Sequence, residues 1–247
     1  MSSSLVLRDV SKNYGAIEAL TNVNMEIGVG EVIGLMGDNG AGKSTLVKIV
    51  AGNFPQSHGQ IEVNGEVVNF HRPIDARNVG IEAVYQDLAI ADNLTAAENV
   101  FLGRELKKGW GPFAVLDKQA MIDRSAELFE ELKSETRPKD VVRKMSGGQR
   151  QAVAIARTRL SDAKVVLMDE PTAAISVRQV AEVLELIRRL KAQNVSVILI
   201  SHRMPDVFAV CDRIVVLRRG HKVADKATTD TSPEEITGLI TGAIHAA

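Results

Sequence analysis

The sequence has little of several features that would assign it to a special class. Its single cysteine, Cys211, cannot form an internal disulfide, and one free thiol in 247 residues is typical of a reducing compartment, where we expect it to be buried and inert. The 30 basic and 31 acidic side chains nearly cancel. No strong overall field therefore draws the chain to DNA, RNA or anionic lipid, and we expect no nucleic-acid partner.

Long apolar runs are also missing. The strongest ones, Val195–Ile200 and Ile214–Leu217, are far shorter than the roughly 20 residues that span a bilayer, so a membrane role would require a partner. Residues Met1–Leu5 have no basic region followed by an apolar stretch, so we expect no secretion signal and a chain that begins here. We find no internal repeat and no low-complexity segment. Length and apolar content suit one globular domain over residues 1–247.

The apolar pattern predicts an α/β fold. Short alternating pieces over Leu5–Ile27, with breaks at residues 13–15 and 21–22, indicate a strand meander, and Ile61–Val68 with its central Asn-Gly indicates a hairpin with a type I′ turn. Strand, helix and strand then alternate toward the carboxyl end, which favours a largely parallel core sheet. The expected elements after the amino-terminal region are strands over 32–36, 165–168, 195–200 and 214–217, and helices over 96–102, 118–132, 146–160 and 177–192.

A glycine-rich loop follows the strand predicted at 32–36 and precedes an apolar-periodic segment. It comprises Gly37, Asp38, Asn39, Gly40, Ala41, Gly42, Lys43 and Ser44, with Thr45 next. Two glycines, a lysine and a hydroxyl at this spacing are typical of a phosphate loop, in which backbone N–H groups and a helix start surround phosphates. Lys43 would face the β- and γ-phosphates and Ser44 would bind Mg²⁺. The alternative is a glycine-rich turn capped by Ser44.

Two further segments carry candidate chemistry. Asp169 and Glu170 directly follow the strand predicted at 165–168, where Asp169 could hold Mg²⁺ and Glu170 could act as a general base on water, although acids before a proline also cap helices. The segment Ser146–Gln149 precedes a helix and offers a second anion site, or simply an N-cap with a glycine pair.

Taken together, these motifs resemble the ATP-binding cassette (ABC) nucleotide-binding domain over nearly the whole chain. Gly37–Ser44 is similar to the Walker A motif, Gln86 to the Q-loop, Met145–Gln149 to the signature, Asp169-Glu170 to the end of Walker B, and His202 to the switch histidine. The resemblance implies a P-loop NTPase core, an amino-terminal antiparallel β subdomain and an α-helical subdomain inserted at about residues 87–160. It also implies ATP and Mg²⁺ as ligands.

The resemblance assigns roles residue by residue. Tyr14 would stack on adenine, Gln86 would contact the metal, the water and the membrane partner, and His202 would contact the γ-phosphate. From the residues alone, Tyr14 could be a strand aromatic, Gln86 a solvated loop amide and His202 a helix cap. In the family, Ser146, Gly147, Gly148 and Gln149 of one cassette close over the ATP bound by another, which implies a head-to-tail homodimer.

Three positions in two motifs depart from the family pattern. Met145 stands where leucine is usual, a change of similar volume that should be tolerated. Ile175 and Ser176 replace the usual Leu-Asp of the D-loop, which removes a carboxylate that often bridges two cassettes. We therefore expect altered communication between the two sites and unaltered catalysis.

Among ABC proteins, a single compact cassette without a coiled coil resembles a transporter motor. The segments 70–77, 85–89 and 98–105 are similar to bacterial monosaccharide importers of the ribose, xylose and fructose type, in the single-cassette variety. The resemblance implies an integral-membrane permease, indirectly a periplasmic sugar-binding protein, and a peripheral position on the cytoplasmic side of the inner membrane. The alternative is a regulatory module that dimerises with nucleotide, but such a module would not need Glu170.

Overall fold

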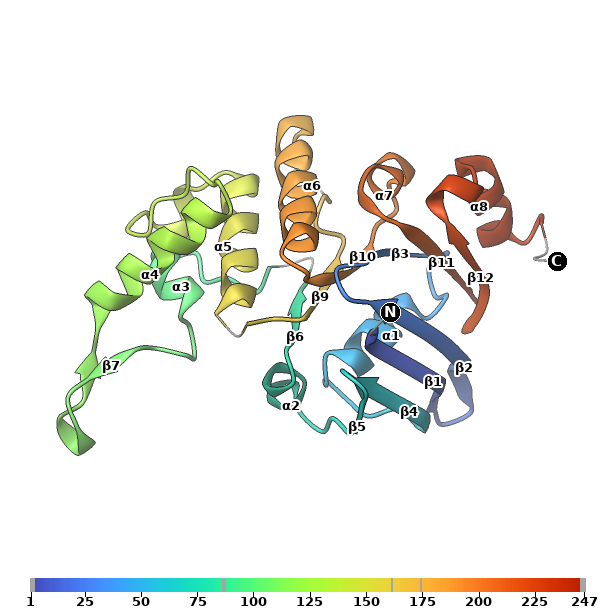
Figure 1. Cartoon of the computed structure of the whole chain (residues 1–247), viewed down its shortest axis with the longest axis horizontal. Coiled ribbons are helices and arrows are strands. Elements are labelled where there is room, and N and C mark those ends of the chain that lie inside the picture. Colours follow the sequence, from blue (N-terminus) through green and yellow to red (C-terminus); the bar gives the residue numbers. More distant parts are fainter. Residues whose placement is uncertain (1–2, 86–87, 161, 174, 245–247) are drawn as a thin grey trace.

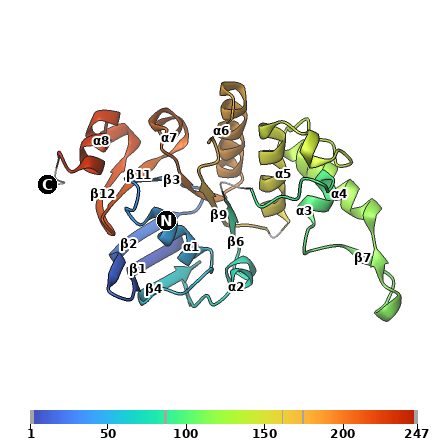
Figure 2. The ribbon, with the colours of Figure 1, turned by 180° about the vertical axis from the view of Figure 1, so that it is seen from behind.

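The computed structural model describes residues 3–85, 88–160, 162–173 and 175–244. Figure 1 shows a core sheet between an antiparallel sheet and a row of helices, with a helical lobe at one end of the molecule; Figure 2 shows the same arrangement from behind. None of the helices in these ranges is long and apolar enough to cross a membrane.

The antiparallel sheet has the order β2-β1-β4-β5, with β1 at Ser3–Tyr14, β2 at Ile17–Gly28, β4 at His58–Val63 and β5 at Glu66–Val68. Asn64 and Gly65 both take positive φ, 51° and 84°, which confirms the type I′ hairpin. The break expected at residues 21–22 is wrong. β2 continues through Asn22, which has a φ of 48° and donates its N–H to the Ser11 hydroxyl at 2.9 Å. A bulge within the strand therefore replaces a turn.

The core sheet has the order β12-β11-β3-β10-β9-β6, and all neighbouring strands are parallel except β12 and β11. The strands are β3 at Val32–Met36, β6 at Ile81–Val84, β9 at Val165–Asp169, β10 at Ser196–Ile200, β11 at Arg213–Arg218 and β12 at His221–Ala227. β10 lies between β3 and β9, so the loops that follow these three strands meet at one edge of the sheet. The predicted α/β class and parallel core are confirmed.

Buried side chains separate into one cluster on each face of the core sheet. Ile198 packs with the cluster that includes α1 at Lys43–Val50 and the antiparallel sheet, whereas Val197 and Leu199 face the opposite cluster. Helices on that second face include α6 at Val177–Ala192, α7 at Met204–Val210 and α8 at Pro233–Thr241. Cys211 is buried there, as expected, and burial raises the pKa of its thiol.

The helical lobe is the part of residues 88–160 built on three helices that pack together: α3 at Ala96–Val100, α4 at Lys118–Glu131 and α5 at Gly147–Arg159. A short hairpin, β7 at Lys107–Lys108 and β8 at Val115–Leu116, projects from it, with the 3-10 helix η1 at Gly111–Phe113 between its strands. The remaining elements are α2 at Pro73–Asn78, η2 at Val142–Lys144 and η3 at Thr228–Asp230.

Candidate nucleotide site

The loop after β3 has a shape that glycine alone permits at two positions. A Cβ on Gly37 would lie 2.3 Å from the Leu217 carbonyl oxygen, and one on Gly42, which has a φ of 104°, would lie 2.8 Å from the Ala19 carbonyl oxygen. Gly42 is also the N-cap of α1 and has no side chain to cap it. The backbone N–H groups at this helix start are therefore left for a ligand, as in a phosphate-binding loop.

Lys43 spans this loop from the first turn of α1. Its Nζ donates to the carbonyl oxygens of Gly37 at 2.7 Å and Asp38 at 2.9 Å, and only 7% of the residue is exposed. Burial lowers the pKa of Lys43, while the charges of Glu170, Asp38 and Asp169 oppose that shift. The ammonium group is thus held by neutral carbonyl groups close to acidic side chains.

A cavity of about 330 Å³ lies over the loop at the carboxyl ends of β3, β9 and β10. It brings together most of the predicted loop residues with both predicted acids and the predicted histidine. Its lining consists of Ala19, Asn39, Gly40, Ala41, Gly42, Lys43, Ser44, Thr45, Asp169, Glu170, Ile200 and His202. Gly37 and Asp38 do not line this cavity, but their carbonyl oxygens accept from the Lys43 ammonium group.

Asp169 ends β9, and Glu170 follows it with a φ of 51° that turns its carboxylate into the cavity. Burial raises the pKa of both carboxyl groups, and Asp169 raises that of Glu170 further, whereas His202 and Lys43 act in the opposite direction. Oε1 of Glu170 is buried and has no hydrogen-bond partner among the described residues. His202 Nε2 lies 3.2 Å from it, but not in hydrogen-bond alignment.

Two predicted residues lie outside this cavity. Gln86 is outside the described residues, so its predicted place in the site stays a prediction. Tyr14, which is 47% exposed at the end of β1, packs edge-on against Phe54 with ring centroids 5.9 Å apart and has Lys12 Nζ at 5.4 Å from its centroid. The Tyr14 side chain is therefore available at the surface.

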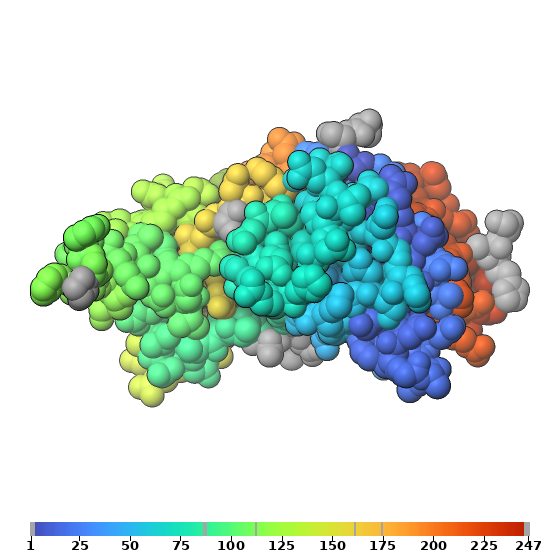
Figure 3. Space-filling view, turned by 90° about the horizontal axis from the view of Figure 1, so that it is seen from below, coloured from blue at the N-terminus to red at the C-terminus, as the bar shows by residue number. Residues whose placement is uncertain are grey.

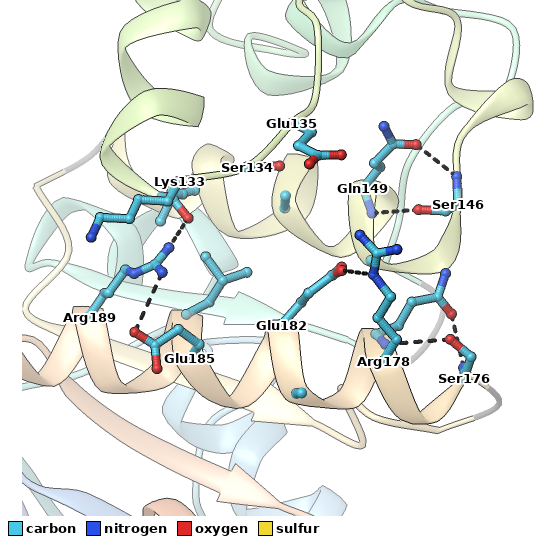
Figure 4. Close-up of a pocket in the computed structure, with 16 residues that line it drawn as sticks. Lys133, Ser134, Glu135, Ser146, Gln149, Ser176, Arg178, Glu182, Glu185 and Arg189 are labelled. Carbon is cyan, nitrogen blue, oxygen red and sulfur yellow. Dashed lines mark hydrogen bonds and ion pairs between the residues drawn. The ribbon is translucent and has the colours of Figure 1, made fainter.

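The signature segment lines a separate cavity of about 760 Å³ between α5 and α6 (Figure 4). Ser146 is the N-cap of α5: its Oγ accepts from Gln149 N–H at 3.3 Å, and its own N–H donates to Gln149 Oε1 at 3.0 Å. Gly148 lies close to α6: a Cβ there would lie 2.5 Å from Glu182 Oε2, so the Glu182 side chain would have to move. Within the described part of the chain, this cavity and the first share no lining residue.

Gly147 of the signature lies against the segment that leads into α6, and Ser176 begins that helix. A Cβ on Gly147 would lie 2.8 Å from Ile175 Cγ2. Ser176, which replaces the usual D-loop aspartate, is the N-cap of α6, with its N–H bound to Gln179 Oε1 at 2.9 Å. The serine therefore keeps the capping function that aspartate would also serve, without the negative charge.

Sequence reasoning missed Ala19, Ile200 and Glu182 as neighbours of these sites. Ala19 and Ile200 enter the first cavity only through the packing of β2 and β10 against the loop, and Glu182 reaches Gly148 only because α6 crosses the start of α5. Such contacts depend on tertiary structure and leave no local sequence signal.

Comparison with known proteins agrees with this geometry. The family model described as ABC transporter matches residues 20–173. The chain belongs to the ABC transporter family. The expected ABC-type ATPase, which couples ATP hydrolysis to transport, is thereby confirmed.

Three relatives of this ABC cassette are sugar-import proteins. It is 46% identical to the xylose/arabinose import ATP-binding protein XylG of Sulfolobus acidocaldarius, over 98% of the chain and 95% of that protein. It is 39% identical to the fructose import ATP-binding protein FrcA of Rhizobium meliloti, over 97% of the chain and 94% of that protein. It also matches the ribose import ATP-binding protein RbsA of Geobacillus kaustophilus at 39% identity, over 96% of the chain but only 47% of that longer protein.

The fold of the cassette is equally well represented among solved structures. A nucleotide-free ATP-binding cassette from an ABC transporter superposes with a TM-score of 0.81 at 23% identity, over 97% of this chain and 95% of that one. The predicted P-loop core with an antiparallel β sheet and added helices is therefore the ABC ATPase fold. The resemblance to monosaccharide importers is confirmed by the relatives above.

Proposed function

We propose that this cassette is the ATP-hydrolysing subunit of a monosaccharide importer. The observation that carries the proposal is the convergence of Lys43, Asp169, Glu170 and His202 on one cavity at the ends of adjacent parallel strands. The two relatives that match it over nearly their full length are named as importers of xylose/arabinose and of fructose. A pentose or hexose is thus the proposed class of transported solute, and the sugar itself would not touch this subunit.

ATP is the proposed ligand of the cavity. The N–H groups of Asn39 to Thr45 and the Lys43 ammonium would bind its β- and γ-phosphates, since a loop without a capping side chain leaves those donors open. Lys43 would exchange its carbonyl partners, Gly37 and Asp38, for phosphate oxygens of higher negative charge.

The donors in the cavity fit Mg²⁺. Ser44 and Asp169 offer a hydroxyl and a carboxylate on the same lining, and burial of Asp169 raises its pKa, so a nearby cation would stabilise its charged form. We propose that these two side chains, with Gln86, hold the ion. Bound there, Mg²⁺ would neutralise phosphate charge during transfer.

Glu170 is the proposed general base. Its buried Oε1 lacks a hydrogen-bond partner among the described residues and faces the cavity, where it could accept a proton from an attacking water. The raised pKa brings Glu170 nearer to neutral pH, which suits a base that must take up and release a proton. His202, against the same carboxylate, would position it and contact the γ-phosphate.

The signature cavity supports a head-to-tail homodimer. Because Ser146, Gly148 and Gln149 line a cavity apart from the phosphate loop, they cannot complete the site of their own chain without a large rearrangement. We propose that they close over ATP bound to the loop of a second copy, with Gly147 allowing the close approach of α6. The N-terminus of α5 would then face the γ-phosphate.

The proposed organisation is one nucleotide-binding domain over residues 1–247, with an inserted helical subdomain at about 87–160. That subdomain, led by Gln86, would dock on an integral-membrane permease, which in turn receives sugar from a periplasmic binding protein. The cassette would therefore lie peripherally on the cytoplasmic side of the inner membrane. Nucleic acid has no part in this proposal.

The test measures ATP binding and phosphate release by the purified chain, alone and reconstituted with a monosaccharide permease. Lys43→Ala should nearly abolish both, because it removes the fixed charge facing the phosphates. Lys48→Ala, a substitution of an exposed lysine on the same helix, should keep both. Normal binding and turnover in Lys43→Ala would overturn the site. Turnover that is indifferent to permease and sugar-loaded binding protein would overturn the importer role alone.

A further inference from the structure

The β7–β8 hairpin is the most isolated part of the described chain. Its two strands pair only through Lys107 with Leu116 and Lys108 with Val115, and it projects from the helical lobe away from the core. In Figure 3 the residues of this hairpin form the far green end of the elongated molecule. So short a ladder buries little of its own apolar surface.

The tip of this hairpin carries two aromatic side chains that the rest of the molecule does not cover. Trp110 is 91% exposed and Phe113 is 83% exposed, and Val115 beside them is 57% exposed. Single exposed apolar residues are ordinary, but three on one ten-residue projection form a patch, and such patches mark interaction sites.

The same hairpin carries two adjacent lysines on its first strand. Lys107 and Lys108 are exposed and form no ion pair within the described ranges. Glu105 accepts the Gly103 N–H at 2.8 Å, and the charge of Lys107 helps to lower the pKa of its carboxyl group. Asp117 caps α4 by accepting from Ala120 N–H. The hairpin therefore has an aromatic tip and a lysine pair on the strand that leads to it.

We propose that this hairpin inserts its aromatic tip into the headgroup region of an anionic lipid bilayer. Tryptophan prefers the membrane interface, and each lysine near an anionic surface adds to binding. The charge of the whole chain is near zero, so the attraction is local to the hairpin.

The lipid contact rests on the proposed function only in one respect, namely that a permease would bring the cassette to the membrane. Its chemistry is independent of ATP. Hairpin contact would add a second anchor to the permease contact, as with other peripheral proteins that need two signals for stable attachment.

The experiment uses the fact that Trp110 is the only tryptophan of the chain. The purified full chain is mixed with vesicles of phosphatidylglycerol and phosphatidylcholine, or of phosphatidylcholine alone. We expect the tryptophan emission to shift to shorter wavelength and to be quenched by brominated acyl chains in the anionic vesicles, with a smaller effect in the neutral ones. Vesicle flotation measures the bound fraction in parallel.

Variants separate the aromatic and basic contributions. Trp110→Ser combined with Phe113→Ser should lower vesicle partitioning by about tenfold or more, since it removes two large apolar side chains. Lys107→Glu combined with Lys108→Glu should abolish the preference for anionic lipid. Val67→Ser, at a 56% exposed position on β5, is the matched control and should bind like the parent chain. ATP turnover should be unchanged in all three.

Other outcomes overturn the proposal. Unchanged emission with both vesicle types, or equal flotation of the aromatic variant and its parent, would exclude lipid insertion. A spectral shift that requires the permease would assign the hairpin to a protein contact, and a concentration-dependent shift without vesicles would assign it to a second copy of the chain. If turnover fails while vesicle binding persists, the proposed function fails and the lipid contact stands.

Discussion

The imidazole and the backbone of His202 approach opposite oxygens of the Glu170 carboxylate. Its N–H donates to Oε2 at 3.4 Å, while its Nε2 lies 3.2 Å from Oε1. The contact joins the residue after β9 to the second residue after β10, so it depends on the parallel pairing of those strands. It holds a buried carboxylate in place where desolvation opposes its charge.

Because burial disfavours the charge of Glu170, we predict that Glu170→Gln stabilises the nucleotide-free protein. Burial raises the folded-state pKa of Glu170 above its ordinary value of 4.5, so the folded protein binds a proton at Glu170 more tightly than the unfolded chain does. At neutral pH, where the carboxylate is ionised, its charge therefore destabilises the folded protein. The amide should raise the free energy of unfolding and the Tm at neutral pH, because it removes a charge that burial disfavours. As the pH falls through the folded-state pKa of Glu170 toward 4.5, the carboxylate of the parent protein becomes protonated, and the stability advantage of Glu170→Gln should disappear.

Thermal unfolding without nucleotide at neutral and acidic pH measures this effect. Glu185→Gln, at a position whose side chain is 48% exposed, is the control and should leave Tm within about 1 °C. An equal or lower Tm for Glu170→Gln at neutral pH would show that the carboxylate is not a stability cost.

Glu82→Ala should be strongly destabilising. Glu82 is 4% exposed on β6, and its carboxylate lies 2.5 Å from Arg104 Nη2 and 3.7 Å from Arg77 Nε. Without it, Arg77 and Arg104 remain beside Arg157, whose pKa is lowered by burial and by both of these charges. Loss of one partner from a buried ion pair costs roughly 3–5 kcal/mol.

Chemical denaturation of Glu82→Ala against Glu62→Ala measures the difference. Glu62 pairs with Arg8, which is 58% exposed, so that substitution should cost little, because exposed ion pairs contribute little to stability. Equal losses for the two variants would contradict the view that Glu82 joins the helical lobe to the core sheet.

Glu82 also shows why parts of the fold could not be predicted. β6 contains this buried acid, which interrupts the apolar run expected of a core strand, and its partner Arg104 lies 22 residues away. β12 is an edge strand with few buried residues, and α2 and α7 have only 6 and 7 residues, too few to show helical periodicity. Longer elements such as α4 and α6 were predictable within one or two residues.

The site was predictable where chemistry depends on local spacing. The loop residues from Gly37 to Ser44 need glycine and lysine in a fixed order, so the sequence indicates them directly. The contact between His202 and Glu170, 32 residues apart, requires the strand order of the sheet. The family resemblance assigned His202 to the γ-phosphate, whereas composition and periodicity could not.

Tyr14→Ala should weaken ATP and GTP binding by similar factors of about fivefold. Stacking uses the face of a base and does not distinguish its edge, and each stacked base contributes roughly 1–3 kcal/mol. Tyr14→Phe retains a ring and should bind nearly like the parent chain. Calorimetry with both nucleotides decides the matter: if the affinity is unchanged while stability falls, Tyr14 serves only to pack against Phe54.

Glu170→Gln should also let ATP hold two copies of the chain together. The substitution removes the base but leaves the phosphate loop, Lys43 and Asp169 intact, so ATP should bind and persist. Its γ-phosphate would then bridge the loop of one copy and the start of α5 in the other, and mass action would raise the dimer population.

Light scattering after size-exclusion chromatography, with and without ATP and Mg²⁺, reads this state directly. Adding Ser146→Arg should return the variant to the monomer, because a bulky side chain at the N-cap of α5 blocks the contact between copies. Hydrolysis at the parental rate in Glu170→Gln would show that another group activates the water. A hydrolytically inactive variant that stays monomeric with saturating ATP would leave Glu170 as the base and count against a site shared between two cassettes. After that last result, the test would be repeated on the permease complex, because the permease holds the two cassettes at high local concentration. If Ser146 belongs to the shared site, that site must form there.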